Sequence, residues 1–142
     1  MQDILKEVLL DHVKSPKNKK ELDNPDLSGH SNNPVCGDVV KVDLKINNDT
    51  VVDVSISGQG CAVSQASMSI FGEEIKGSSL KDVKKKIEQF KSLLGTNEVE
   101  EITILSEEAR VLKFLEGNPS KIRCALLSWS AIEEVLDRFL RL

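Results

Sequence analysis

Three cysteines and one aspartate stand out because their types and surroundings could bind a metal ion or handle sulfur. Cys36 and Asp38 are separated by Gly37 alone. Side chains two residues apart in an extended chain project to the same side, so this thiolate and this carboxylate could face one point. Gly37 carries no side chain that could crowd that point. A thiolate and a carboxylate together suit zinc or iron.

The other two cysteines are expected near the starts of helices. Cys61 follows a Gly-Gln-Gly sequence at residues 58–60, where a predicted strand gives way to a predicted helix. The free amides and the positive dipole end of a helix N-terminus favour a thiolate. Cys124 falls in the first turns of the last predicted helix, with the positive charges of Lys121 and Arg123 nearby.

Plain burial is the competing interpretation of each cysteine. Free cysteine is among the most buried residue types and is often inert. The sequence contains three cysteines and no CxxC pair, which indicates neither a disulfide framework nor a compact zinc motif. From the residues alone, one shared site and three separate buried thiols both stay open.

Apolar periodicity predicts the elements that position these residues. Apolar and polar side chains alternate over residues 40–46 and 52–57, around a turn at 47–49, which predicts a β-hairpin with Val52 on its buried face. The segment 14–37 contains three prolines and is interpreted as a long surface loop. Residues 99–105 are expected to form a short strand or an extended loop.

Helical spacing of apolar residues recurs in several segments, at about 4–15, 62–75, 80–94, 106–115 and 121–140. We therefore expect an α+β fold, with an antiparallel three-stranded sheet and about five helices packed largely on one face. The length of 142 residues fits a single domain spanning 1–142.

The composition excludes several classes of function. With 19 basic and 23 acidic residues, the net charge is −4, which gives no electrostatic reason to expect nucleic acid binding. No run of 18 apolar residues is present, so no membrane span is expected. The N-terminal residues lack the apolar stretch of a signal peptide, and a cytoplasmic location is expected.

The motifs around the cysteines resemble those of the iron–sulfur cluster assembly scaffold family, of the IscU, SufU and NifU N-terminal type. The resemblance covers nearly the whole chain and includes several ordered motifs. They are Asp11-His12, Pro16 and Asn18; Asn33-Pro34 and Cys36-Gly37-Asp38; Gly58, Gly60-Cys61, Ser64 and Ala66-Ser67; and Pro119, Lys121, Cys124, Leu127 and Trp129. By this resemblance, Cys36, Cys61 and Cys124 match the three cysteines that bind a cluster or zinc, and Asp38 matches the aspartate that shares the site.

One position separates the branches of this family. The IscU branch has a histidine immediately before the third cysteine, where this sequence has Arg123. Arginine stays protonated and cannot bind a metal. Arg123 and the additional helix predicted at 80–94 make the chain resemble the SufU branch, in which the three cysteines and the aspartate bind zinc. The resemblance implies zinc as the cofactor, with a transient [2Fe–2S] cluster as the alternative.

The resemblance also implies a role in sulfur transfer. Proteins of the SufU branch take persulfide sulfur from a cysteine desulfurase of the SufS type, and downstream scaffolds or apo acceptor proteins are the expected recipients. Cys36 is the expected sulfur acceptor because it lies in the predicted loop, and Cys124 is the second candidate. The chain would be at most a zinc-dependent sulfurtransferase. A scaffold that assembles a [2Fe–2S] cluster, and a zinc-stabilised interaction module without turnover, stay open as alternatives.

Three further residues could belong to the site or to the core. His12 is expected to pack against the first helix or the loop, with metal binding as the less favoured role. His30 is expected to be exposed to solvent. Trp129 fits the apolar stripe of the last helix and is expected in the core.

Overall fold

The computed structural model describes residues 2–35, 37–95 and 101–140, which form one sheet covered by helices. The strands are β1 (Leu27–Asn33), β2 (Asp38–Asn47) and β3 (Thr50–Gln59), and they pair antiparallel in the order β1-β2-β3. The helices are α1 (Asp3–Lys14), α2 (Ala62–Ile75), α3 (Leu80–Leu93), α4 (Glu107–Val111) with the 3₁₀ turn η1 (Leu112–Leu115), and α5 (Pro119–Leu140). The predicted α+β class, with helices on one face of a three-stranded sheet, is confirmed.

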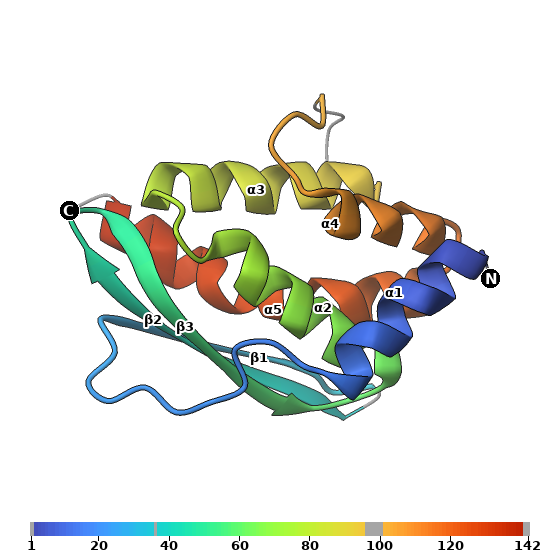
Figure 1. The fold of residues 1–142 in the computed structure, drawn as a ribbon, viewed down its shortest axis with the longest axis horizontal. Helices are drawn as coiled ribbons and strands as arrows, with labels where there is room; N and C mark the ends of the chain where they lie inside the picture. The colour runs from blue at the N-terminus through green and yellow to red at the C-terminus, as the bar shows by residue number, and fades with distance from the viewer. Residues whose placement is uncertain (1, 36, 96–100, 141–142) are drawn as a thin grey trace.

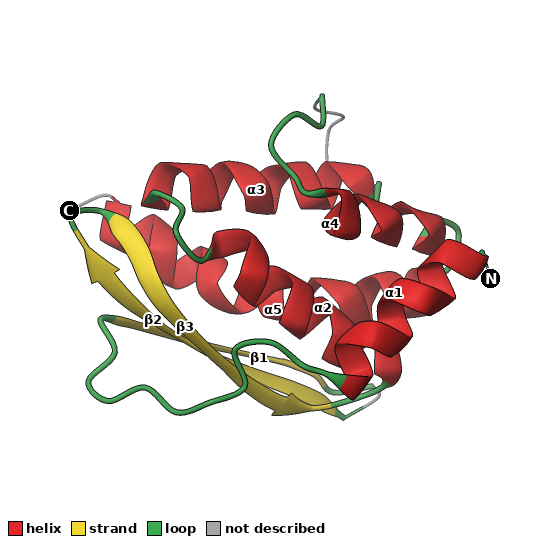
Figure 2. Cartoon of the chain, in the orientation of Figure 1, coloured by secondary structure: helices red, strands yellow, loops and turns green. Residues whose placement is uncertain are grey.

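The helices lie in two layers above the sheet (Figures 1 and 2). The inner layer contains α5, which packs on β1 and β2, and α2, which packs on β3 and α5. The outer layer contains α3, against α5, and α4, against α2. Both inner helices therefore touch the sheet directly, and each carries one cysteine at or near its N-terminal end.

The predicted hairpin is confirmed as β2 and β3, but the predicted buried face of Val52 is wrong. The cross-strand pairs Val42–Ile56 and Leu44–Val54 place their side chains in the core. A β-bulge between Lys45 and Ile46 then shifts the register. As a result Val51 is buried and Val52 is exposed, the reverse of what simple alternation predicts.

The first strand corrects the interpretation of residues 14–37 as one long loop. β1 occupies 27–33 at the edge of the sheet, and its buried positions include Leu27, Gly29 and Asn33. Because only one large apolar side chain occupies these positions, the sequence carries no apolar alternation. The third strand is β1, and residues 101–105 form an extended loop; residues 99 and 100 lie outside the described residues.

A group of aromatic side chains holds α5 in place. Trp129 is fully buried, and its ring stacks on Phe90 of α3 with centroids 3.8 Å apart and lies 4.7 Å from the ring of Phe71 of α2. The predicted core position of Trp129 is confirmed. The last helix is thereby fixed against α2 and α3, which positions the cysteine in its second turn.

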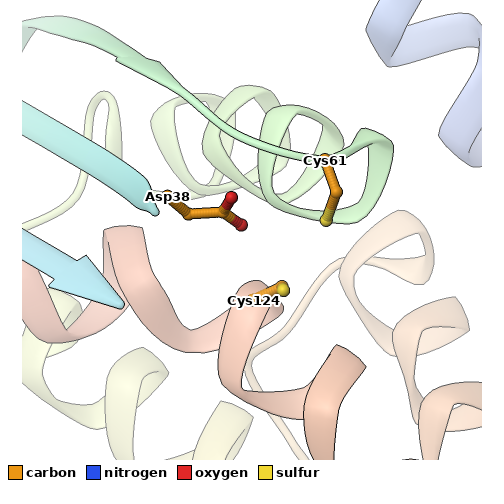
Figure 3. A group of neighbouring side chains, drawn as sticks. All are labelled: Asp38, Cys61 and Cys124. Carbon is orange, nitrogen blue, oxygen red and sulfur yellow. The ribbon is translucent and has the colours of Figure 1, made fainter. Parts of the chain in front are cut away.

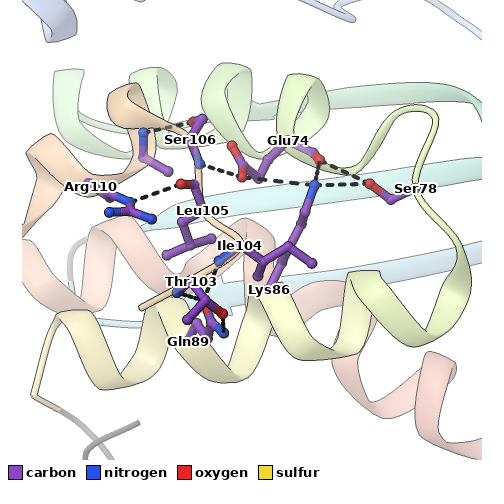
Figure 4. Close-up of polar contacts among 10 residues, drawn as sticks. Glu74, Ser78, Lys86, Gln89, Thr103, Ile104, Leu105, Ser106 and Arg110 are labelled. Carbon is purple, nitrogen blue, oxygen red and sulfur yellow. Dashed lines mark hydrogen bonds and ion pairs between the residues drawn. The ribbon is translucent and has the colours of Figure 1, made fainter. Parts of the chain in front are cut away.

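Buried polar contacts attach the loop before α4 to α2 and α3 (Figure 4). Glu74 of α2 accepts the backbone N–H of Ser106 at 2.8 Å. Gln89 of α3 accepts the backbone N–H groups of Thr103 and Ile104 at 2.9 and 3.0 Å. Lys86 donates to the backbone carbonyl of Glu74 at 2.7 Å. The Glu74 and Gln89 side chains satisfy backbone groups of the loop, and Lys86 of α3 bonds directly to α2.

Gly29 allows the close packing of α5 on β1, and Gly29→Ala tests it. A Cβ at this position would lie 1.9 Å from the backbone oxygen of Ala131. We expect Gly29→Ala to lower the free energy of unfolding by about 2–3 kcal/mol, measured by urea denaturation. Ser31→Ala on the same strand is the control and should change it by less than about 0.5 kcal/mol. Equal stability of the two variants would show that α5 does not press on β1.

Candidate metal centre

Three side chains from distant parts of the sequence meet at one end of the sheet (Figure 3). Asp38 is the first residue of β2, Cys61 is the N-cap of α2, and Cys124 lies in the second turn of α5. One carboxylate oxygen and the two sulfur atoms all lie within 4.8 Å of one another. The structure therefore brings together three of the four residues predicted to bind the metal.

The carboxylate of Asp38 is buried without a protein partner for one of its oxygens. The residue is 4% exposed, and Oδ2 accepts no hydrogen bond from the described residues. A buried carboxylate oxygen without a partner costs free energy unless a cation lies against it. The carboxylate group of Asp38 points toward the two thiols in Figure 3, so it fits a site that binds a cation.

Cys61 is held where a thiolate is favoured. Burial raises the pKa of the Cys61 thiol, but the backbone amide of Ser64 and the Cys124 side chain lower it. The Ser64 hydroxyl and the Val63 amide add to this lowering, so the pKa ends below the ordinary value of a cysteine. The two amides belong to the first turn of α2, which the sequence predicted to favour a thiolate.

Cys124 is 3% exposed and is positioned by the contact between α2 and α5. Ser67 of α2 donates to the backbone carbonyl of Ala125 at 2.5 Å. The indole N–H of Trp129 donates to the same Ser67 hydroxyl at 3.1 Å. These two bonds join the helices beside Cys124 and hold its sulfur near that of Cys61.

The donor set fits a tetrahedral zinc ion. Zinc binds thiolate sulfur at about 2.3 Å and carboxylate oxygen at about 2.0–2.2 Å, so neighbouring ligand atoms lie about 3.5–3.8 Å apart. The three observed atoms lie within 4.8 Å of one another and need to approach by at most about 1 Å to reach that geometry. Cys36, the predicted fourth ligand and sulfur acceptor, lies outside the described residues, and its role stays a prediction.

The remaining predicted residues are not members of this cluster. Arg123 is exposed and lines a pocket of about 310 Å³ with Asn33, Pro34 and Leu127 among others. His30 is exposed, as predicted. His12 is buried, and its ring lies between Ser69 and Glu108.

His12 packs as a structural residue. Its Nδ1 lies 2.6 Å from the Ser69 hydroxyl and its Nε2 lies 2.7 Å from the Glu108 carboxylate. Both ring nitrogens therefore have protein partners, which supports the packing role that the sequence favoured over metal binding. Glu108 comes from α4, so this histidine also links α1 to the outer layer of helices.

Gly60 and Ser64, which the sequence offered only as members of the family motifs, shape the cluster. A Cβ on Gly60 would lie 2.7 Å from Cγ of Asp38 and 2.1 Å from the hydroxyl oxygen of Ser64. Gly60 thus permits the close approach of β3 to the carboxylate. The sequence could not show that Asp38 and Ser64 are the neighbours of Gly60.

Residues 4–141 match the family described as the NifU-like N terminal domain. The chain belongs to this family. It is 31% identical to the zinc-dependent sulfurtransferase SufU of Bacillus subtilis over 94% of this chain and 90% of that protein. It is 30% identical to the iron–sulfur cluster assembly scaffold protein IscU of Streptococcus pyogenes, over 92% of this chain and 81% of that protein.

Solved structures agree with this family assignment. The crystal structure of a SUF-system scaffold protein from Fervidobacterium islandicum has a TM-score of 0.82 at 27% identity, covering 92% of this chain and 94% of that one. An N-terminal NifU-like protein from Brucella abortus shares the fold, with a TM-score of 0.77 at 18% identity. No helix in the described parts of this chain is long and apolar enough to cross a membrane.

Gly60→Ala tests the geometry of the cluster without removing any ligand atom. The added methyl group would push Asp38 and Ser64 away from their positions, so we expect zinc affinity to fall by about 10- to 100-fold. The measurement is competition with a chromophoric chelator. Gln59→Ala, an exposed neighbour on β3, is the control and should bind zinc as the wild type does. Wild-type affinity in Gly60→Ala would place the metal somewhere other than beside Asp38.

Proposed function

We propose that this protein binds one zinc ion through Cys36, Asp38, Cys61 and Cys124, and that it accepts persulfide sulfur at this site during iron–sulfur cluster assembly. The observation that carries the proposal is the buried, unpartnered carboxylate oxygen of Asp38 beside two thiols. A site of this composition suits zinc, and sulfur chemistry requires thiolates at a surface that a partner can reach.

One of the relatives supports sulfur transfer as the role of the site. The relative from Bacillus subtilis is named as a zinc-dependent sulfurtransferase, and it matches nearly the whole chain. The position before the third cysteine is Arg123, which is exposed and cannot be a ligand. A carboxylate is an uncommon choice for a purely structural zinc site, which argues against an interaction module without turnover.

A cysteine desulfurase of the SufS type is the proposed sulfur donor. A cysteine thiolate of this protein attacks the terminal sulfur of the desulfurase persulfide. A new S–S bond forms, the S–S bond of the desulfurase breaks, and the desulfurase cysteine leaves as a thiolate with the electron pair. Zinc, when bound, keeps its thiolate ligands deprotonated and protected from oxidation. The sulfur then passes to a downstream scaffold or an apo acceptor protein.

Cys36 is the proposed acceptor in this step, ahead of Cys124. Cys124 is 3% exposed and lies under the junction of α2 and α5, where a large partner has poor access. The residues on either side of Cys36 connect β1 to β2, and Val35 among them is 85% exposed. Asp38 and Cys61 then stay as ligands while the acceptor thiolate reacts.

Assembly of a transient [2Fe–2S] cluster is the second candidate function. Several relatives are named as iron–sulfur cluster assembly scaffolds, among them IscU of Thermotoga maritima, 28% identical over 95% of this chain. The same cysteines and Asp38 would bind the cluster in this case. Arg123 favours sulfur transfer, because the resemblance to IscU predicts a histidine at its position.

Cys36→Ala tests the acceptor role by a sulfur-transfer assay, and it separates both functions from a purely structural zinc site. The zinc-loaded protein is mixed with a SufS-type desulfurase and cysteine, and protein-bound persulfide is measured by mass spectrometry. We expect Cys36→Ala to accept less than about a tenth of the wild-type sulfur, because its acceptor thiolate is missing. Val35→Ala, at the exposed neighbouring position, is the control and should accept sulfur normally.

Thermal unfolding of the same variants completes the test. Sulfur transfer by Cys36→Ala at the wild-type level would contradict the acceptor role. Loss of the folded state in Cys36→Ala, with no sulfur transfer by the wild type, would identify a structural zinc site instead.

A further inference from the structure

One hydroxyl group contacts a cysteine of the cluster. Ser64 lies in the first turn of α2 and is 1% exposed. Its hydroxyl lies 3.8 Å from Sγ of Cys61 and 3.0 Å from the backbone carbonyl oxygen of the same residue. The hydroxyl is also beside Asp38, since a Cβ on Gly60 would touch both groups. Ser64 therefore sits inside the candidate metal centre without being a ligand.

The hydroxyl proton of Ser64 is free to turn toward the sulfur. The Cys61 carbonyl already accepts the backbone N–H of Gln65 at 3.0 Å, so it keeps a donor when the hydroxyl turns away. A thiolate carries a full negative charge and is the stronger acceptor, because hydrogen bonds to charged groups are the stronger ones. The Ser64 hydroxyl thus becomes a donor to Cys61 as soon as this cysteine is deprotonated.

This hydrogen bond distinguishes Cys61 from an acceptor thiolate. A thiolate that receives hydrogen bonds holds its charge more tightly and attacks sulfur more slowly, since nucleophilicity falls with basicity. The same bond fixes the direction of the sulfur lone pairs, as the groups around metal ligands do. A reactive acceptor thiolate needs a charge that no hydrogen bond holds back and a sulfur atom that can turn toward the incoming persulfide.

We propose that Ser64 is a positioning residue that keeps Cys61 on the metal as the cysteine that takes no sulfur. Incoming sulfur is thereby directed to another cysteine of the site. This inference rests on the proposed sulfur-carrier function. It gives the three cysteines unequal roles through a residue that neither ligates the metal nor accepts the transferred sulfur.

The first test uses metal-free protein and iodoacetamide, at a pH at which the cysteines are fully ionised. Rates of alkylation of Cys61 and Cys124 are measured in the same molecule by peptide mass spectrometry. We expect Ser64→Ala to raise the ratio of the Cys61 rate to the Cys124 rate by about threefold or more. Alanine is smaller than serine, so the variant introduces no clash.

Ser69→Ala is the matched control for this test. Ser69 is also a buried serine of α2, and its hydroxyl bonds to His12 and Lys17 but to neither Cys61 nor Cys124. We expect Ser69→Ala to keep the wild-type ratio even if it lowers stability. An unchanged ratio in Ser64→Ala, or an equal change in Ser69→Ala, would overturn the inference.

The second test locates sulfur in zinc-loaded protein exposed to glutathione persulfide. A protein thiolate attacks the terminal sulfur, the S–S bond of the persulfide breaks, and glutathione leaves as a thiolate, with no net oxidation. We expect the wild type to carry added sulfur on Cys36 or Cys124, and Ser64→Ala to carry several times more on Cys61.

The two tests separate the inference from the proposed function. Sulfur mainly on Cys61 of the wild type would overturn the role of Ser64 and leave the sulfur-carrier function standing. If no cysteine of the wild type takes up sulfur, the sulfur-carrier function fails and the assignment of Cys61 fails with it. A raised alkylation ratio in Ser64→Ala would in that case still establish the hydrogen bond to Cys61.

Discussion

The buried carboxylate of Asp38 needs a cation, and this need links the fold to its chemistry. One oxygen of Asp38 has no hydrogen-bond partner in the described structure, and two thiols lie beside it. An uncompensated carboxylate in such a place would oppose folding, whereas a zinc ion turns it into a ligand. In the proposed function, a zinc ion bound here would offset this electrostatic cost.

The rest of the structure serves to bring the three side chains to one point. The first residue of β2, the N-cap of α2 and the second turn of α5 meet because α2 and α5 both lie on the same face of the sheet. Ser67 ties α2 to α5 beside Cys124, and the stacking of Trp129 on Phe90 holds α5 from its other side. In the proposed sulfur transfer, ligands placed by three such elements would keep their geometry when one thiolate leaves the metal to react.

Apolar patterning was enough to predict most of the fold. The bounds of α2 match the predicted 62–75, and the hairpin was recognised because one of its faces is buried. β1 was missed because Gly29 and Asn33 occupy buried positions where the pattern expects large apolar side chains. Val51 is buried and Val52 is exposed because of a bulge, which apolar alternation along the sequence does not predict. The cysteine spacing alone could not predict the shared site, which followed from the resemblance, and the neighbours Gly60 and Ser64 required coordinates.

The most direct test of this account is zinc K-edge X-ray absorption of the zinc-loaded protein. The account predicts about three sulfur scatterers at about 2.3 Å and one oxygen at about 2.0–2.2 Å, from Cys36, Cys61, Cys124 and Asp38. A first shell of nitrogen and oxygen alone, or of two sulfur atoms or fewer, would contradict the proposed metal centre and with it the sulfur-transfer function.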